Sequence, residues 1–409
     1  MKKPLLVLRT MGSVDGSQQF KRIKIENNGI TKLPMEPADK TGGLETTEAL
    51  CIQLEDGFKI VPLLPDVKKV YLEITTKCNL ACTTCIRNSW EDSLNHMEWP
   101  VFQAVLEQLK GLPDLKTVHF GGFGEPLSHP RIMEMVAAVK GLGLQAELIT
   151  NGLLLSEEVA GRLVELGLDR LYISMDGPDA EEYNEIRVGS DFGAVVANIQ
   201  GLNRQKQARR VEYPTLGIEF VAMRKNYHKL PKLVRLANEL KVDTILVTNV
   251  LPYNEEMKDE ILYDRDDTKI SFGAESMWVL IKAQLPHMKL RTERYCKFIE
   301  DKALSVSQEG YVSPCNALLH SYQCYIYGRV KKMKPYRLGN VMEKSLREIW
   351  TDAGYAHFRS TVKDFRFPSC TDCRYLDGCS YVDDNEMDCW GNSPSCSECL
   401  WARGMIICP

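Results

Sequence analysis

The sequence predicts an α/β protein whose largest part is a parallel sheet, preceded by a small β-rich extension and followed by a cysteine-rich region. Residues 66–280 alternate six times between strand-like and helix-like patterns, which implies a parallel sheet with right-handed crossovers. Residues 281–409 lose this rhythm and hold ten of the 14 cysteines. Residues 1–65 contain short strand-like runs separated by Gly, Pro, Asn and Asp.

Six segments of the central region have strand character, and helical segments lie between them. The expected strands are Lys69–Ile74, Thr117–Phe120, Ala146–Thr150, Arg170–Ser174, Gly217–Ala222 and Thr244–Thr248. The expected helices include Pro100–Leu109, Ile132–Leu142, Glu157–Leu166 and Leu230–Leu240. Active-site residues gather at the carboxyl ends of parallel strands, so the residues that follow these strands are the first functional candidates.

Composition excludes several classes of protein. The chain has 409 residues, of which 44% are hydrophobic, enough for one large and one smaller domain. A net charge of -4 does not favour a nucleic-acid partner, and basic clusters such as residues 331–334 are expected to be solvated surface. The apolar run after Lys3 ends at Arg9, and no stretch approaches the roughly 20 apolar residues of a membrane span. The sequence therefore predicts a cytoplasmic protein without a membrane partner.

Three cysteines stand close together directly after the first expected strand. Cys78, Cys82 and Cys85 have the spacing Cys-x-x-x-Cys-x-x-Cys. Three thiolates can hold three irons of a 4Fe–4S cube and leave the fourth iron open to a substrate or cosubstrate, whereas four cysteines ligate an ordinary ferredoxin cluster. Clustered thiols in a chain without a visible signal peptide favour metal binding over disulfides. A structural zinc loop is the alternative.

This cysteine loop resembles the loop of the radical S-adenosylmethionine (SAM) superfamily. The resemblance implies that residues 66–280 form a partial (β/α)6 TIM-like barrel and that the protein is a radical SAM oxidoreductase or maturase. It also implies a catalytic 4Fe–4S cluster whose open iron binds the amino and carboxylate groups of SAM. Reductive cleavage of SAM then gives methionine and a 5′-deoxyadenosyl radical, while the protein binds, orients and shields the reactants.

A glycine-rich segment follows the second expected strand. Residues Gly121–Pro126 resemble the motif whose backbone pairs with the SAM amino group, which implies cofactor contacts by Gly122, Gly124 and Glu125. Glycine permits such a close approach of backbone and ligand. Thr84 stands where the family often has an aromatic residue near adenine, so the adenine contacts differ here.

Other strand ends also match the SAM site of this superfamily. Ser174 and Asp176 end the fourth strand and Arg187 follows; the family's Ser and Arg contact the SAM carboxylate and ribose, and Arg pairs well with a carboxylate. Asn151 ends the third strand, and Asn249 ends the sixth, where the family usually contacts adenine. Helix caps and turns are equally good interpretations of these two asparagines.

The C-terminal cysteines resemble the SPASM domain, which holds two auxiliary 4Fe–4S clusters. Cys296 and Cys315 have the spacing Cys-x13-Gly-x4-Cys, and the run Cys370-x2-Cys373-x5-Cys379 follows. Asp383 occupies the position of the next expected cysteine.

From the spacing we expect two groups of four cysteines, one for each auxiliary cluster. Two of the ten C-terminal cysteines would then not be ligands. The first group comprises Cys296, Cys315, Cys389 and Cys324. The second comprises Cys370, Cys373, Cys379 and either Cys396 or Cys399. One or two structural zinc sites are the alternative.

Short stretches narrow the resemblance to one subgroup. Residues 85–91, 249–253, 255–257 and 388–404 are similar to the radical SAM maturases associated with tungsten-containing oxidoreductases of the aldehyde:ferredoxin oxidoreductase type. The resemblance implies maturation of a tungsten enzyme or its pterin cofactor as substrate, with ferredoxin or flavodoxin as electron donor.

Three other functions remain open from the sequence. The nearest is modification of a peptide or protein side chain by thioether formation, carbon–carbon bond formation or oxidation. Sulfatase-maturing relatives have an Asp that serves as a base at the position of Asn316. Asparagine cannot act as a base, which argues against sulfatase maturation. The others are a cofactor-building enzyme resembling the pterin-precursor synthase and a non-catalytic iron–sulfur carrier. The catalytic acid or base is not assigned, although Asp383, Asp384 and Asp388 lie among the cluster thiols.

Overall fold

The computed structural model describes residues 67–90, 92–263, 281–288, 290 and 293–408, together with the backbone of five strands before residue 63. These strands are β1 (Leu5–Arg9), β2 (Phe20–Lys24), β3 (Ile30–Pro34), β4 (Thr46–Leu54) and β5 (Gly57–Pro62). β1 pairs with β2, and β3, β4 and β5 form a second antiparallel sheet. These strands lie in the region where the sequence predicts short strand-like runs.

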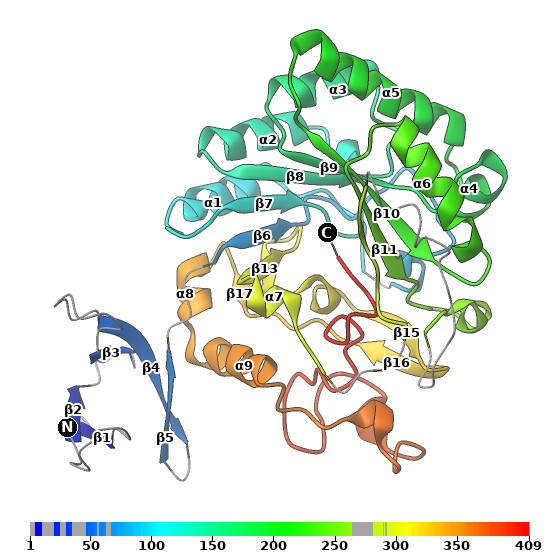
Figure 1. Ribbon diagram of the computed structural model, residues 1–409. Helices are drawn as coiled ribbons and strands as arrows, with labels where there is room; N and C mark the ends of the chain where they lie inside the picture. The colour runs from blue at the N-terminus through cyan, green and yellow to red at the C-terminus, as the bar shows by residue number, and fades with distance from the viewer. Residues whose placement is uncertain are drawn as a thin grey trace, which may run out of the picture.

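The main body is a curved sheet of ten strands in the order β12-β11-β10-β9-β8-β7-β6-β13-β14-β17 (Figure 1). Six neighbouring strands run parallel in sequence order. They are β6 (Lys69–Leu72), β7 (Thr117–Phe120), β8 (Gln145–Thr150), β9 (Arg170–Ser174), β10 (Thr215–Ala222) and β11 (Thr244–Asn249). All six strands expected from the sequence are confirmed, which is the partial barrel that the resemblance implied.

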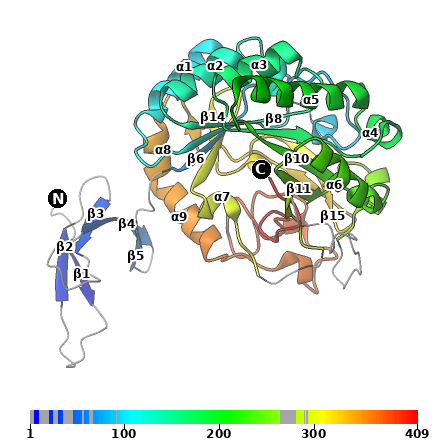
Figure 2. The same cartoon turned by 45° about the horizontal axis from the view of Figure 1, so that its top comes forward.

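Helices cover the convex side of this sheet (Figure 2). They are α1 (Trp99–Leu109), α2 (Ile132–Gly141), α3 (Glu157–Glu165), α4 (Ala180–Ile186), α5 (Phe192–Arg209) and α6 (Leu230–Glu239). In α6, Leu230, Leu233, Val234 and Ala237 are buried, the spacing of one helix face. Replacing a fully buried leucine of this kind by alanine costs about 2–5 kcal/mol. None of the helices in the described part of the chain is long and apolar enough to cross a bilayer.

The sheet continues past residue 280, where the sequence pattern suggested that it would end. β12 (Lys282–Gln284) pairs with β11, and β13 (Ala303–Val306) pairs in parallel with β6. β14 (Tyr311–Ser313) and β17 (Gly339–Asn340) complete the edge. β13 was missed because all four of its residues are buried, so the strand shows no alternation of apolar and polar residues.

The remaining elements of the C-terminal region are short. They are α7 (Lys297–Glu300), α8 (Leu346–Thr351), α9 (Ala353–Lys363), and the hairpin of β15 (Tyr322–Ile326) and β16 (Arg329–Met333). Single 3-10 turns of the chain cover Ile86–Ser89, Pro126–Ser128, Tyr227–Lys229, Glu256–Glu260, Asn316–Leu318, Cys370–Asp372 and Ser380–Val382. A capping box of Ser345 and Glu348 begins α8.

Residues 401–408, which we call the C-terminal segment, run into the concave side of the sheet, opposite the helices (Figures 1 and 2). The Ile407 backbone N–H donates to the Thr248 hydroxyl at 2.9 Å, and the Asn249 side-chain amide donates to the Met405 carbonyl at 2.9 Å. The end of the chain therefore lies beside the carboxyl end of β11, where the functional site of a parallel barrel is expected.

Candidate active site

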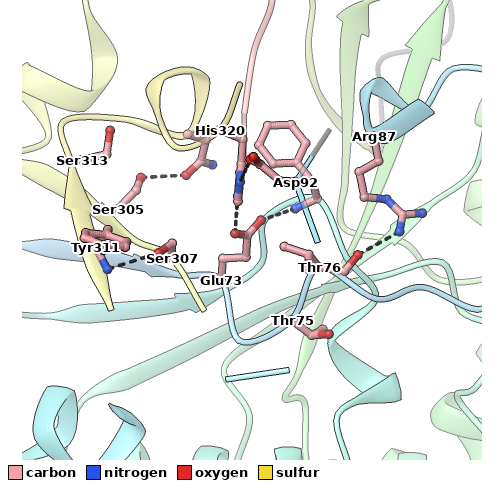
Figure 3. Close-up of polar contacts among 12 residues, drawn as sticks. Glu73, Thr75, Thr76, Arg87, Asp92, Ser305, Ser307, Tyr311, Ser313 and His320 are labelled. Atoms are coloured by element: carbon pink, nitrogen blue, oxygen red, sulfur yellow. Dashed lines mark hydrogen bonds and ion pairs between the residues drawn. The ribbon is translucent and has the colours of Figure 1, made fainter. Parts of the chain in front are cut away.

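The cysteine loop leaves the carboxyl end of β6 and is held in place by Arg87. The Arg87 guanidinium donates to the Thr76 carbonyl at 2.9 Å (Figure 3). It also donates to the Cys85 thiol at 3.2 Å and to the Leu80 carbonyl at 3.4 Å. Arg87 thus fixes the loop and supplies positive charge to it.

Nine of the residues expected from the sequence line one cavity of about 160 Å³ at the carboxyl ends of the strands. They are Cys78, Cys82, Cys85, Gly122, Gly124, Glu125, Asn151, Ser174 and Arg187. They come from five separate parts of the barrel, so their convergence depends on the fold. Asp176 and Asn249, which were expected to contact the cofactor, do not line this cavity.

The glycines of the glycine-rich segment are required by the protein's own packing. A Cβ atom on Gly124 would lie 2.2 Å from the Thr75 carbonyl oxygen, and one on Gly122 would lie 2.6 Å from Glu73 Cγ. Both distances are far shorter than van der Waals contact. The segment can therefore pack against the strand end of β6 only with glycine at these positions.

Glu125 organises the cavity wall through hydrogen bonds. Its carboxylate accepts from the Thr150 hydroxyl at 2.7 Å, the Asn151 backbone N–H at 2.7 Å and the Leu127 backbone N–H at 2.9 Å. Burial raises the pKa of Glu125, and these hydrogen bonds oppose the rise. Asn151 in turn donates to the Asn79 side-chain oxygen at 2.8 Å on the cysteine loop. Glu125 thus joins three strand ends.

Arg187 presents a cation to the cavity and is oriented by Asp176. Asp176 is fully buried, accepts from the Val221 backbone N–H at 2.8 Å and pairs with Arg187 Nη2 at 2.8 Å. Arg187 Nε is buried and has no hydrogen-bond partner among the described residues. Burial raises the pKa of the Cys82 thiol to about 11, and Arg187 opposes this. An anionic group in the cavity would satisfy the Arg187 donor.

A second cavity of about 270 Å³ adjoins the first and shares its Thr84, Cys85, Gly122, Phe123, Ile149 and Glu219. We call it the inner cavity, because it is closed by Trp401 and residues 406–408 of the C-terminal segment. Asn249 lines it, but the Asn249 side-chain amide is used by the carbonyls of Met405 and His287. The structure therefore gives Asn249 a role in anchoring the C-terminal segment.

Glu219 is a site residue that the sequence analysis missed. It projects from β10 and lines both cavities, and burial raises the pKa of its carboxyl group to about 7. Cys408 lines the inner cavity, and burial and then the charge of Glu219 raise the pKa of its thiol to about 11. The available signal was one acidic residue within the otherwise uncharged strand Thr215–Ala222.

The C-terminal thiols form a first group around Cys315. Burial raises the pKa of Cys315 well above its ordinary value, and the neighbouring thiols Cys296 and Cys399 raise it further. The pKa of Cys396 is raised in the same way, by burial and then by Cys399, Cys315 and Cys296. Mutual repulsion of this kind requires proximity. Cys296, Cys315, Cys396 and Cys399 therefore lie together.

A second group contains Cys370 and Cys389. Burial raises the pKa of Cys370, and among its further causes is the neighbouring thiol Cys389. Cys324 is buried beside Lys331, Glu398 and Arg329, and no cysteine is among the groups that shift its pKa. This arrangement differs from the expected one, which placed Cys389 and Cys324 with Cys296.

The segment between Cys389 and Cys396 explains the difference. Asp388 accepts hydrogen bonds from the backbone of Trp390 and Asn392 and from the Ser395 hydroxyl at 2.9 Å, so this segment folds back tightly. Cys389 and Cys396 can then belong to different groups although they are only seven positions apart in the sequence. Within the described residues, no three Cys, His, Asp or Glu side chains converge on a site for a single metal ion.

Two family models match the chain. The radical SAM superfamily model matches residues 72–237, and the SPASM iron–sulfur cluster-binding domain matches residues 296–374. The cofactor-modifying protein of tungsten-containing aldehyde ferredoxin oxidoreductase from Pyrococcus furiosus is 41% identical over 84% of this chain and 97% of its own length. The PqqA peptide cyclase of Gluconobacter oxydans is 30% identical over 49% of this chain and 55% of its own.

Solved structures share the fold at low sequence identity. Streptococcus suis SuiB bound to S-adenosylmethionine superposes with a TM-score of 0.53 at 17% identity, over 78% of this chain and 73% of SuiB. The anSMEcpe structure with bound AdoMet superposes with a TM-score of 0.52 at 14% identity, over 82% of this chain and 94% of that one. These likenesses show the fold: a partial barrel followed by a smaller C-terminal region.

Proposed function

Because this chain belongs to the radical SAM family that includes the cofactor-modifying protein of tungsten-containing aldehyde ferredoxin oxidoreductase, we propose that it matures a tungsten-containing oxidoreductase or the pterin cofactor of such an enzyme. Membership makes the protein an enzyme that uses a catalytic 4Fe–4S cluster, SAM and auxiliary iron–sulfur clusters. When bound, the catalytic cluster and SAM supply a 5′-deoxyadenosyl radical by reductive cleavage of SAM.

One observation carries the proposed chemistry: three thiols line the same cavity as Arg187, whose Nε has no hydrogen-bond partner among the described residues. Cys78, Cys82 and Cys85 would hold the cluster through three irons. Arg187 would bind the SAM carboxylate, with a charge-assisted hydrogen bond worth roughly 1.5–3 kcal/mol.

The remaining cavity residues would complete the SAM site and link it to the cysteine loop. Gly122 and Ser174 would contact SAM from opposite walls of the cavity. Glu125, Asn151 and Asp176 would act as positioning residues, since their polar groups are bonded to the protein. Gly124 would act in the same way, because it permits the close packing against β6.

The inner cavity is the proposed place of the substrate. Its volume of about 270 Å³ admits the reacting part of a larger molecule, and pockets for whole small-molecule ligands run to about 300–1,000 Å³. Among its described lining groups, His119 has a pKa lowered to about 4 by burial, and the Cys408 thiol has one raised to about 11. Glu219, whose pKa is raised by burial to about 7, is suited to accept or return a proton at neutral pH.

A larger cavity of about 520 Å³ lies on the other side of the C-terminal segment. It shares Tyr71, Trp401 and residues 406–408 with the inner cavity, and Arg294 and Lys297 add positive charge to its lining. We propose this outer cavity as the approach for the part of the substrate that the inner cavity cannot hold.

The C-terminal region would bind two auxiliary clusters in the cytoplasmic enzyme. We assign Cys296, Cys315, Cys396 and Cys399 to one, and Cys370, Cys373, Cys379 and Cys389 to the other. Residues 66–280 would then carry the SAM chemistry and residues 281–409 the auxiliary clusters, although one sheet joins them; residues 1–65 remain a separate extension. A ferredoxin or flavodoxin is the proposed electron donor.

Modification of a peptide or protein side chain is the second candidate. The similarity to PqqA peptide cyclases favours it, at 30% identity over 49% of this chain for one of them and 25% identity over 73% for another. The tungsten-related relative matches 84% of the chain, so the maturation proposal has the broader support.

An anaerobic turnover experiment separates the two candidates. The reconstituted enzyme is incubated with SAM, reductant and either a tungstopterin extract with its apo-oxidoreductase or candidate Cys-rich peptides. Maturation predicts that 5′-deoxyadenosine rises above the uncoupled rate only with the tungsten components, and that the oxidoreductase gains activity. A rise with peptides alone, together with a mass change in the peptide, would overturn it. A variant with Cys78, Cys82 and Cys85 replaced by Ala controls for enzyme-independent cleavage.

A further inference from the structure

A buried chain of polar side chains joins the C-terminal region to the glycine-rich segment of the SAM cavity (Figure 3). His320 Nε2 lies 2.6 Å from Glu73 Oε2, and His320 Nδ1 lies 3.2 Å from Asp92 Oδ2. The other oxygen of Glu73 accepts the Phe123 backbone N–H at 3.0 Å. Glu73 and His320 are 1% and 4% exposed, so water does not compete for the bond between them.

The four residues come from separate segments of the chain. Glu73 follows β6, Asp92 follows the cysteine loop, Phe123 belongs to the glycine-rich segment, and His320 lies between Cys315 and Cys324. The Trp90 ring stacks on the His320 ring with centroids 4.1 Å apart, which fixes the imidazole between its two carboxylate partners.

The bond from Phe123 to Glu73 sets the direction of the neighbouring carbonyl. The N–H of Phe123 and the C=O of Gly122 belong to one trans peptide, so they point in opposite directions. The N–H points to Glu73, behind the wall of the SAM cavity, and Gly122 lines that cavity. The Gly122 carbonyl is therefore directed away from Glu73, toward the space where an ammonium group could donate to it.

We propose that Glu73 and His320 are positioning residues for SAM: they hold the Gly122–Phe123 peptide so that its carbonyl accepts from the SAM amino group, and His320 makes this depend on the C-terminal region. The inference rests on the SAM site assigned above. Through His320 and Glu73, the C-terminal region would affect SAM affinity without contacting SAM.

The geometry also makes the contact depend on the protonation of His320. Both of its partners are carboxylates, and only an imidazolium has an N–H on each ring nitrogen. Burial opposes this charge, but Glu73 and Asp92 together raise the pKa of His320 above 6.5. Glu309 and Arg337 line a polar cavity of about 100 Å³ beside Asp92 and His320, and are the other charged groups there. SAM affinity should therefore fall as the pH rises through the pKa of His320.

The test measures SAM affinity of the cluster-loaded protein by anaerobic equilibrium dialysis between pH 6 and 9. Wild type should lose affinity by about 5- to 20-fold with rising pH, the usual size of coupling between two sites. His320→Gln keeps one N–H donor but cannot titrate, so its affinity should be weak and independent of pH. Asp92→Asn removes one carboxylate partner and should shift the wild-type midpoint to lower pH. His228→Gln changes an exposed histidine in the connection between β10 and α6 and should behave as wild type.

The outcomes separate this inference from the proposed function. Equal pH profiles for wild type and His320→Gln, or an unmoved midpoint in Asp92→Asn, would overturn the positioning role. Failure of wild type to bind SAM at any pH would instead overturn the SAM site itself. Iron content and circular dichroism of each variant exclude misfolding as the cause, and Asp92, whose side chain is 38% exposed, is a mild site for substitution.

Discussion

The barrel and the C-terminal region both gather cysteines, but they do so by different means. In the barrel, Cys78, Cys82 and Cys85 lie on one loop, and most of the other groups at the cavity sit at or just after a strand end, while Arg187 ends α4 and Glu219 lies within β10. In the C-terminal region, the thiols near Cys315 come from segments up to 103 residues apart, Cys296 to Cys399, and no sheet sets their spacing. A sheet turns sequence order into spatial order, whereas loops tied together by metal do not.

The largest expected effect tests the barrel side of this comparison. Replacing Cys78, Cys82 and Cys85 by Ala should abolish reductive SAM cleavage, because these thiols share one loop and no other cysteine lines the cavity among the described residues. About eight of roughly twelve irons should remain if three 4Fe–4S clusters are present in wild type. Iron analysis and a 5′-deoxyadenosine assay measure both results. Cleavage at the wild-type rate would show that the catalytic cluster lies elsewhere.

The grouping of the auxiliary thiols is tested by paired substitutions. Cys296→Ser with Cys399→Ser affects one proposed group and should lose about four irons, whereas Cys296→Ser with Cys370→Ser affects both and should lose about eight. Cys324→Ser is the matched control and should lose none, since we assign Cys324 to neither cluster although it lines one small cavity with Cys315, Cys396 and Cys399. Mössbauer spectra report the cluster number. Loss of a cluster in the Cys324 variant would restore the grouping expected from spacing.

A smaller effect is expected at Arg187. Arg187→Ala removes the cation that faces the cavity, so SAM affinity should fall by roughly 10- to 150-fold, which corresponds to about 1.5–3 kcal/mol. Asp176→Asn should reduce affinity less, because it only loosens the orientation of Arg187. Arg162→Ala removes an exposed arginine of α3 and is the control. Unchanged SAM affinity in Arg187→Ala would make the Arg187–Asp176 pair purely structural.

A further test concerns Glu219 and the stability of the barrel. Its pKa is raised to about 7 in the folded protein, so the folded state favours the neutral carboxyl. The resulting stabilisation of the folded state is fully present below about pH 4.5 and is lost as the pH rises through 7. The free energy of unfolding that is lost is at most about 3 kcal/mol. Between pH 5 and 8, wild type should therefore lose more thermal stability than Glu219→Gln. If the melting temperatures of the two proteins change equally with pH, Glu219 does not titrate in this range.

The same contrast explains what could be predicted from the sequence. The six parallel strands were recognised because strand-like and helix-like patterns alternate along residues 66–280, and nine of the residues expected to contact the cluster or SAM line one cavity. Asp176 and Asn249 also stand at strand ends, but side-chain direction decides that they contact the protein. Such directions depend on neighbouring segments and leave no mark in a local pattern.

Other features depended on contacts that no spacing reveals. β13 was hidden because its four residues are all buried, and Glu219 because a single acidic residue in a strand carries no motif. The thiol groups depended on the fold-back around Asp388, which the regular Cys-x-x-Cys spacing did not indicate. The connection from His320 to Glu73 spans 247 residues and required the coordinates.

The position of the C-terminal segment has a consequence for how the enzyme is made. Trp401 and residues 406–408 form part of the wall of the inner cavity, although β6 to β11, which form the rest of the barrel, end at residue 249. On the ribosome the barrel strands emerge long before this wall exists. During that interval the cysteine loop faces open space on the side that the finished protein closes. The carboxyl ends of β6 to β11 therefore lack this part of the cavity wall until residues 401–408 have been added.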